Sequence, residues 1–205
     1  MFDEVGIAIS NARPSGIPRV KRADKHCFFV GQARDGHMFY AQNDDVSCPL
    51  ARFNLGLDAK SDKNLLALAR TLVDWGDAKT EEIALRYLNS AHTLPLENKY
   101  IIYFPMPYDK LLLPSVIVML GSSKKFMSLV QIITRLTGKR TEGILSGVGA
   151  MCGECTAIPI LTGKTNISLA CGGSRPQTKL EDSELFMALP SKVYNILEPF
   201  LKHEL

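Results

Sequence analysis

Apolar residues recur at helical spacing in the middle of the chain. Leu65, Leu68 and Leu72 fall on one face of a helix expected over 61–75, and Ser61 is placed to cap it. A second helix is expected over 80–90, because Thr80 can cap it and two glutamates follow at the positive end of the helix dipole. The two segments therefore predict neighbouring helices joined by a short loop.

Runs of β-branched and aromatic residues predict strands at 37–42, 100–104, 115–120 and 166–171. The run at 115–120 is apolar at every position after Ser115, so it is expected in the centre of a sheet. A helix should follow it to about Leu136 and end at Gly138. The segment 182–189 is expected to be a short helix ended by Pro190, with a last amphipathic helix from Ser191.

Two short helices, over 27–33 and 48–55, complete the expected elements of the first part of the chain. The fold class is therefore α+β, a mixed sheet with helices packed against it. No flexible linker divides residues 1–205, so we expect one compact domain. Two pseudo-repeated halves, at about 1–95 and 96–205, would enclose a cysteine-lined site.

Composition narrows the function classes only slightly. A hydrophobic content of 46%, a charged content of 22% and a net charge of +3 are typical of a globular protein and give no nucleic-acid footprint. Acidic residues near the N-terminus do not fit a signal peptide, and the apolar run around Leu111–Leu120 is broken by Pro114. We therefore expect a cytoplasmic protein without a membrane segment, whose cysteines are metal ligands or redox thiols rather than disulfides.

Two cysteines begin the same five-residue phrase. Cys48 to Arg52 and Cys171 to Arg175 both read Cys-x-x-(Ala or Ser)-Arg. Each phrase follows a strand that begins after a glycine, and each strand follows an earlier cysteine, Cys27 or Cys155. The fifth cysteine, Cys152, completes a Cys-Gly-Glu-Cys motif. A thiol pattern written twice indicates one site built from two related halves.

These phrases also carry a family resemblance. The sequence resembles the family catalogued as domain of unknown function 169, through the motifs Tyr-Phe-Pro-Met-Pro at 103–107, Ser-Leu-Ala-Cys-Gly-Gly-Ser-Arg at 168–175 and Glu-Leu-Phe-Met-Ala-Leu-Pro at 184–190. Cys27, Gly36 and the Cys48 phrase resemble its first part. Members are familiar from archaea and anaerobic bacteria, which suits an oxygen-sensitive centre. The family supplies no established reaction.

An iron–sulfur cluster is the first hypothesis for the cysteines, because thiolates are its usual ligands and four are the common complement. The ligands of a [4Fe–4S] cluster would be Cys48, Cys152, Cys155 and Cys171, with Cys27 as substitute. Arg52 and Arg175 would hold an anionic ligand or balance negative charge, although both could equally form structural ion pairs. Structural zinc is the second choice, since zinc ribbons generally supply two Cys-x2-Cys knuckles and this chain has one.

A third hypothesis needs no metal. Cys171 would act as a nucleophile, or the two arginine-bearing turns would form a binding module for an anion. His26, His37 and His92 are candidate bases, although no spacing links one of them to Cys171. Buried cysteines can also simply pack in a core. The favoured interpretation is a cytoplasmic thiolate–metal protein whose partner is a small anionic ligand or a redox protein.

Overall fold

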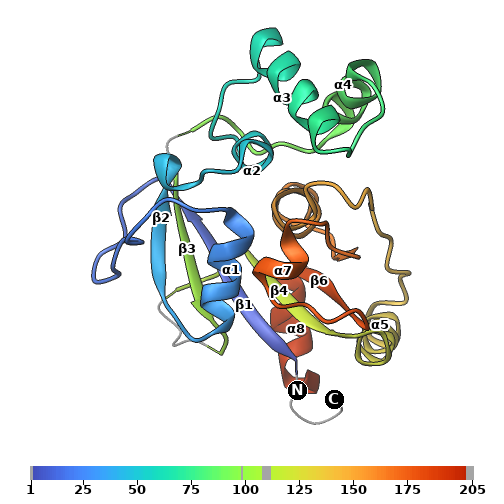
Figure 1. The fold of residues 1–205 in the computed structure, drawn as a ribbon. Helices are drawn as coiled ribbons and strands as arrows, with labels where there is room; N and C mark the ends of the chain where they lie inside the picture. Colours follow the sequence, from blue (N-terminus) through green and yellow to red (C-terminus); the bar gives the residue numbers. More distant parts are fainter. Residues whose placement is uncertain (1, 98, 108–111, 202–205) are drawn as a thin grey trace.

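The computed structural model describes residues 2–97, 99–107 and 112–201, which form a single six-stranded sheet with helices on both faces (Figure 1). Every pairing between these strands is antiparallel. The α+β class is thus confirmed, with an antiparallel rather than a mixed sheet. The spatial order is β2 (Phe39–Gln42), β3 (Tyr100–Pro105), β1 (Asp3–Ser10), β4 (Val116–Ser122), β6 (Glu184–Pro190) and β5 (Asn166–Ser168).

The two central strands, β1 and β4, are buried on both faces. In β4, Val116, Val118 and Leu120 belong to one core cluster, whereas Ile117 and Met119 belong to another. This division follows the two-residue period of a strand, which sends alternate side chains to opposite faces. The central placement expected for this apolar run is confirmed.

One face of the sheet is covered by two helices from distant parts of the sequence. Helix α1 (His26–Arg34) packs there beside the π-helix η2 (Ala150–Ala157), which continues into α6 (Ile158–Thr162). Phe29 of α1 and Met151 of η2 lie in the same core cluster. Residues separated by most of the chain are thereby brought to one surface.

The opposite face is covered on its β4–β6 side by α5 (Ser123–Thr137) and α8 (Ser191–Leu201). Gly138 ends α5 with a positive φ of 66°, as the sequence predicts, and Ser122 at the other end accepts a hydrogen bond from Lys125 N. Phe126 and Leu129 of α5 pack against Ile117 and Met187 of the sheet.

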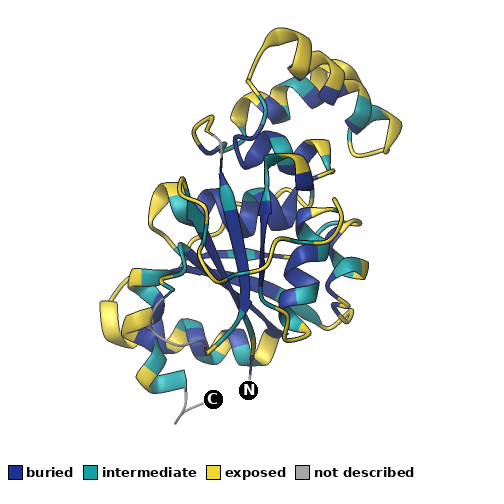
Figure 2. Ribbon diagram, turned by 90° about the vertical axis from the view of Figure 1, so that its left-hand side faces the viewer, coloured by how far each residue is buried: buried dark blue, intermediate teal, exposed yellow. Residues whose placement is uncertain are grey.

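Three helices stand at one end of the sheet. Helix α2 (Pro49–Asn54) carries the hairpin of α3 (Asp62–Asp74) and α4 (Glu81–Ser90), which projects from the body and exposes its outer surface (Figures 1 and 2). Ser61 and Thr80 cap α3 and α4 as predicted. Two shorter elements, the 3-10 helix η1 (Asn43–Asp45) and α7 (Ser174–Gln177), follow strands β2 and β5.

Two elements differ from the sequence-based expectations. The segment expected as a helix at 182–189 forms strand β6, because Phe186 and Ala188 face α1 and η2 while Met187 and Leu189 face α5 and α8. A short apolar run buried on both faces fits a central strand as well as a helix. Strand β1 was not expected at all, although it lies in the middle of the sheet.

The strand order has a symmetry that the linear sequence does not reveal. Counted outward from the centre, one side reads β1, β3, β2 and the other reads β4, β6, β5. On each side the second strand of the sequence is the edge strand, and the third lies between the first and the second.

Within the described residues, no helix is long and apolar enough to cross a membrane.

Candidate functional site

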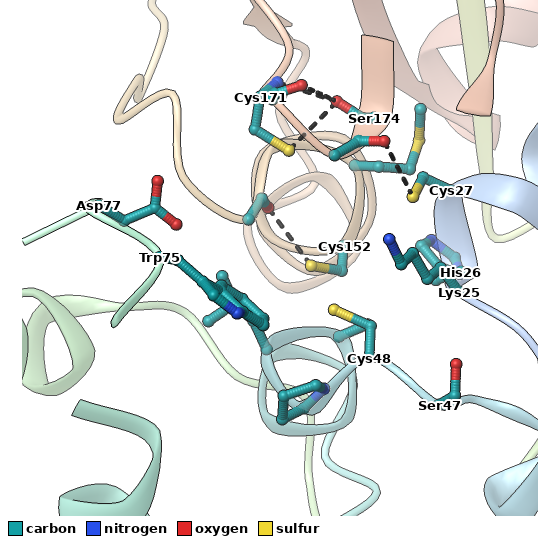
Figure 3. A pocket seen from close by; sticks show the side chains of 17 residues that line it. Lys25, His26, Cys27, Ser47, Cys48, Trp75, Asp77, Cys152, Cys171 and Ser174 are labelled. Atoms are coloured by element: carbon teal, nitrogen blue, oxygen red, sulfur yellow. Dashed lines mark hydrogen bonds between the residues drawn. The ribbon is translucent and has the colours of Figure 1, made fainter. Parts of the chain in front are cut away.

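Four cysteines line one cavity of about 440 Å³. They come from four separate segments of the chain, and their sulfur atoms point toward the same space (Figure 3). The four are Cys27, Cys48, Cys152 and Cys171. All five cysteines of the chain are unpaired thiols.

Each of these cysteines lies where a helix begins. Cys27 is the second residue of α1, Cys48 immediately precedes α2, Cys152 lies in the first turn of η2, and Cys171 precedes α7. Local sequence explains two of these starts. Pro49 occupies the first position of α2, where proline is well tolerated, and Gly149 adopts a φ of 62° before η2.

The two Cys-x-x-(Ala or Ser)-Arg phrases fold into the same backbone turn. The amide of Arg52 donates to the carbonyl of Cys48 at 2.9 Å, and that of Arg175 donates to the carbonyl of Cys171 at 3.1 Å. Five residues further on, the amides of Leu57 and Leu180 donate back to the carbonyls of the two arginines, at 2.8 and 3.0 Å. The repeated phrase therefore encodes a repeated turn.

The two arginine side chains are used to fix these turns, and neither lines the cavity. Arg52 forms a bidentate salt bridge with Asp58, at 2.6 and 2.8 Å, and also donates hydrogen bonds to the carbonyls of Asn43 and Val46. Arg175 donates to the carbonyls of Glu181 and Glu184. Arg52 thus forms a structural ion pair, whereas Arg175 makes hydrogen bonds to carbonyl oxygens.

Cys155 does not line the cavity, although the sequence placed it in the first-choice ligand set. It is fully buried in the core cluster of α1 and the sheet. The wider winding of a π-helix separates the directions of residues three apart more than an α-helix does. Cys152 therefore faces the cavity while Cys155 faces the core, and Cys27, the substitute, lies at the cavity in its place.

Glu154, the acidic residue between these two cysteines, has a structural role. Its buried carboxylate accepts hydrogen bonds from the amides of Ser146 and Gly147, at 2.6 and 3.0 Å, and from the Ser168 hydroxyl at 2.5 Å. The Ser146 hydroxyl is a further donor at 2.9 Å. Glu154 thus ties the glycine-rich loop before η2 to strand β5 and does not face the cavity.

Burial disfavours thiolates at this site when nothing compensates their charge. It raises the pKa of Cys27 to about 12, with a further contribution from the neighbouring Cys171 and Cys48 thiols. Burial likewise raises the pKa of Cys152 well above its ordinary value, and the Asn54 side chain opposes that shift. A cation in the cavity would reverse the balance by favouring the thiolate forms.

His26 lines the cavity but is held neutral. Burial lowers its pKa to about 3. Thr156 donates its hydroxyl hydrogen to the Met151 carbonyl, so it accepts from His26 Nε2, at 3.0 Å, and Nδ1 accepts from the Tyr103 hydroxyl at 2.7 Å. Both ring nitrogens are occupied, and neither His37 nor His92 lines the cavity. The three candidate bases therefore give Cys171 no available proton acceptor.

Sequence reasoning missed several lining residues. Lys25 precedes α1, and its positive charge lowers the pKa of Cys27. Trp75 and Asp77 come from the loop after α3 and form the wall opposite Lys25 (Figure 3). Trp75 is 51% exposed. No sequence signal connects this loop to the cysteines, because the connection is made by the α3–α4 hairpin folding over α2.

The thiols surround the cavity rather than converge on one point. Among the described residues, no three His, Cys, Asp or Glu side chains lie close enough together to hold a single metal ion. A zinc ion needs its sulfur ligands at about 2.3 Å. The arrangement is therefore wider than a preformed single-ion site.

Comparisons with known proteins give a family without a known activity. The family model described as "Uncharacterised ArCR", domain of unknown function 169, matches residues 3–198. The chain is 25% identical over 205 residues to the "Uncharacterized protein MJ0308" of Methanocaldococcus jannaschii, covering 97% of this chain and 87% of that protein. No solved structure matches the chain.

Proposed function

We propose that this chain, which belongs to the uncharacterised ArCR family, binds a thiolate-held metal centre in its cavity. An iron–sulfur cluster is the centre we favour, with Cys27, Cys48, Cys152 and Cys171 as ligands. The observation that carries the proposal is that these four cysteines, scattered along the sequence, line one cavity. Four is also the number of thiolates that a [4Fe–4S] cluster commonly takes.

The chemistry of the lining suits a group that combines cationic metal with negative overall charge. Cys27 and Cys152 lie in the first turns of helices of nine and eight residues, where the helix dipole favours thiolates. Lys25 adds positive charge at the rim. Without a metal the buried thiols would stay protonated, so binding would release protons and would be coupled to pH.

The spacing of the thiols favours a cluster over zinc. Structural zinc sites are closed, with four ligands converging on one ion. The described residues contain no such converged group, whereas a cluster is larger than an ion and holds its ligands further apart. Zinc binding would require the four segments to close together.

The size of the cavity favours a catalytic role over simple electron transfer. A volume of about 440 Å³ falls within the range of small-molecule sites, about 300–1,000 Å³. Lys25 lines this cavity, and its positive charge would attract a small anionic ligand. With four cysteine ligands the centre would have no open iron for Lewis-acid activation, so it would supply redox chemistry, while the chain's own residues would bind and orient the ligand. We place this function in the cytoplasm.

The test is to purify the full chain without oxygen and to measure iron, zinc and acid-labile sulfide together with the visible spectrum. About four irons and four sulfides per chain would support the cluster. One zinc per chain would support the second choice. A colourless, metal-free protein that stays so after reconstitution with iron and sulfide would contradict the proposal. The metal-free alternatives, an anion-binding module or a Cys171 thiol enzyme, would then remain.

A further inference from the structure

The side chain of Asn54 reaches the thiol of Cys152 from the end of α2. Its Nδ2 lies 3.3 Å from Cys152 Sγ and donates a hydrogen bond to it. Asn54 is only 1% exposed, so this contact is shielded from water. Cys48 immediately precedes α2 and Asn54 ends it, so one short helix lies between two residues of the site.

Two glycines form a socket for this amide. A Cβ on Gly149 would come within 2.8 Å of Asn54 Nδ2, and one on Gly153 would come within 3.1 Å. Any larger residue at either position would push the amide away from the sulfur. These two glycines therefore leave space for a side-chain amide beside Cys152.

The other end of the Asn54 amide is unsatisfied. Its Oδ1 is buried and has no hydrogen-bond partner within the described part of the chain. Leaving a buried carbonyl oxygen unpaired costs about 1–3 kcal/mol, and an apolar residue of similar shape would avoid that cost. The stability of the fold therefore does not explain an asparagine at this position, whereas a role at the Cys152 sulfur does.

We infer that Asn54 is a positioning residue for Cys152. Its N–H···S hydrogen bond holds the sulfur toward the cavity and withdraws electron density from it. Hydrogen bonds to ligand sulfurs are among the factors that set the reduction potential of iron–sulfur centres, and outer-shell partners orient the ligands themselves. This inference rests on the proposed function, since a potential exists only if a redox centre is bound.

The experiment compares Asn54→Ala and Gly153→Ala with the wild-type chain, all reconstituted without oxygen. Gly172→Ala is the matched control, because Gly172 also lines the cavity but a Cβ there would meet nothing within 4 Å. We expect the first two variants to shift the midpoint potential to more negative values while they keep most of their metal. The control should keep the wild-type potential. Equal potentials in all four proteins would overturn the inference and leave the metal centre intact.

A second readout works without metal and separates the two failures. In metal-free protein the Asn54 side-chain NH2 should exchange slowly with solvent, and this protection should be lost in Cys152→Ala and in Gly153→Ala but not in Gly172→Ala. Unchanged exchange in Cys152→Ala would show that the sulfur does not hold the amide, which would overturn the inference. A wild-type chain that binds no metal would contradict the proposed function, and the exchange comparison would still decide whether Asn54 positions Cys152.

Discussion

The two sides of the sheet share the parts that present cysteines and differ in the parts that cover them. Each side runs from a central strand to a helix with a cavity cysteine, an edge strand, a Cys-x-x-(Ala or Ser)-Arg turn and an inner strand. The first side adds the α3–α4 hairpin before its inner strand, whereas the second adds α5 and α8 on the opposite face. The two sides thus have the same order of strands and cysteine-bearing segments, while two related halves remain a prediction of the repeated phrase.

This comparison moves the dividing line of the predicted repeat. The strand order groups β3 with β1 and β2, so the halves would divide between β3 and β4 and not near residue 95. The comparison also distinguishes the backbone turn of the repeated phrase from the contacts of its arginine side chain. The backbone turn is the same in both halves, but Arg52 pairs with a carboxylate and Arg175 only with carbonyls. The two phrases thus share the turn, but the side-chain contacts that hold the turn in place differ.

The largest effect should come from removing one cysteine of either half. Cys48→Ser and Cys171→Ser should each remove most of the bound metal, because each takes one thiolate from a four-thiolate set. Cys155→Ser is the control and should keep its metal, since Cys155 faces the core. Metal content measured after anaerobic reconstitution checks all three. Unchanged metal in both Cys48→Ser and Cys171→Ser would disprove the shared site.

The next largest effect should come from Glu154, whose carboxylate holds the loop before η2 to strand β5 on the second side of the sheet. Glu154→Ala should destabilise the chain by about 3 kcal/mol, because it leaves the buried Ser168 hydroxyl and the part-buried amides of Ser146 and Gly147 without their charged acceptor. Denaturant unfolding gives the total loss. Glu154→Gln should lose less, because it keeps one acceptor oxygen. Hydrogen exchange should quicken at 146–147 and leave α1 unchanged; equal loosening of both halves would contradict the local role.

A smaller effect concerns His26, which joins the halves by bonding to Tyr103 and Thr156. Its folded pKa of about 3 lies below the unfolded value of about 6.5, so the unfolded chain binds the extra proton between these values. Metal-free protein should therefore lose about 2 kcal/mol of unfolding free energy between pH 7 and pH 5.

The check is urea unfolding at a series of pH values. His26→Gln should be less stable at pH 7 but should lack most of this pH dependence. His37→Gln is the control, because His37 is exposed and its loss should leave the slope unchanged. A wild-type slope that persists in His26→Gln would assign the proton to another group.

The smallest effects should distinguish the two arginines. Arg52→Ala should cost about 2 kcal/mol, since it breaks a half-buried carboxylate pair and two carbonyl contacts, while Arg175→Ala should cost about 1 kcal/mol. Thermal unfolding measures both. Neither variant should lose metal, because neither guanidinium lines the cavity. Loss of metal without loss of stability would contradict the structural role and would indicate that the arginines bind a ligand.

The sequence predicted elements whose signals are local. Helix caps at Ser61 and Thr80, the helix end at Gly138 and the strand at 115–120 depend on neighbouring residues, and all are confirmed. Strand β6 was misassigned because its apolar run fits both periods, and burial between β4 and β5 decides the outcome. The local pattern could not show which strands would pair, so the central place of β1 was missed.

The site was predictable in composition but not in geometry. The repeated phrases pointed to Cys48 and Cys171, and both line the cavity. The Cys-x-x-Cys spacing suggested that Cys152 and Cys155 face the same way, which holds for an α-helix but not for the π-helix that forms. Asn54 reaches Cys152, and Trp75 reaches the cavity, through tertiary contacts alone, so no spacing in the sequence marks them.

The strand order also bears on when the proposed metal centre could be assembled. Cys27 and Cys48 are synthesised long before Cys152 and Cys171, and β1 cannot pair with β4 until that later part of the chain exists. A nascent chain thus offers two of the four thiols and no enclosed cavity. Metal would therefore bind late, after synthesis of the second half. Bound metal would then link the two sides of the sheet and stabilise them against separation.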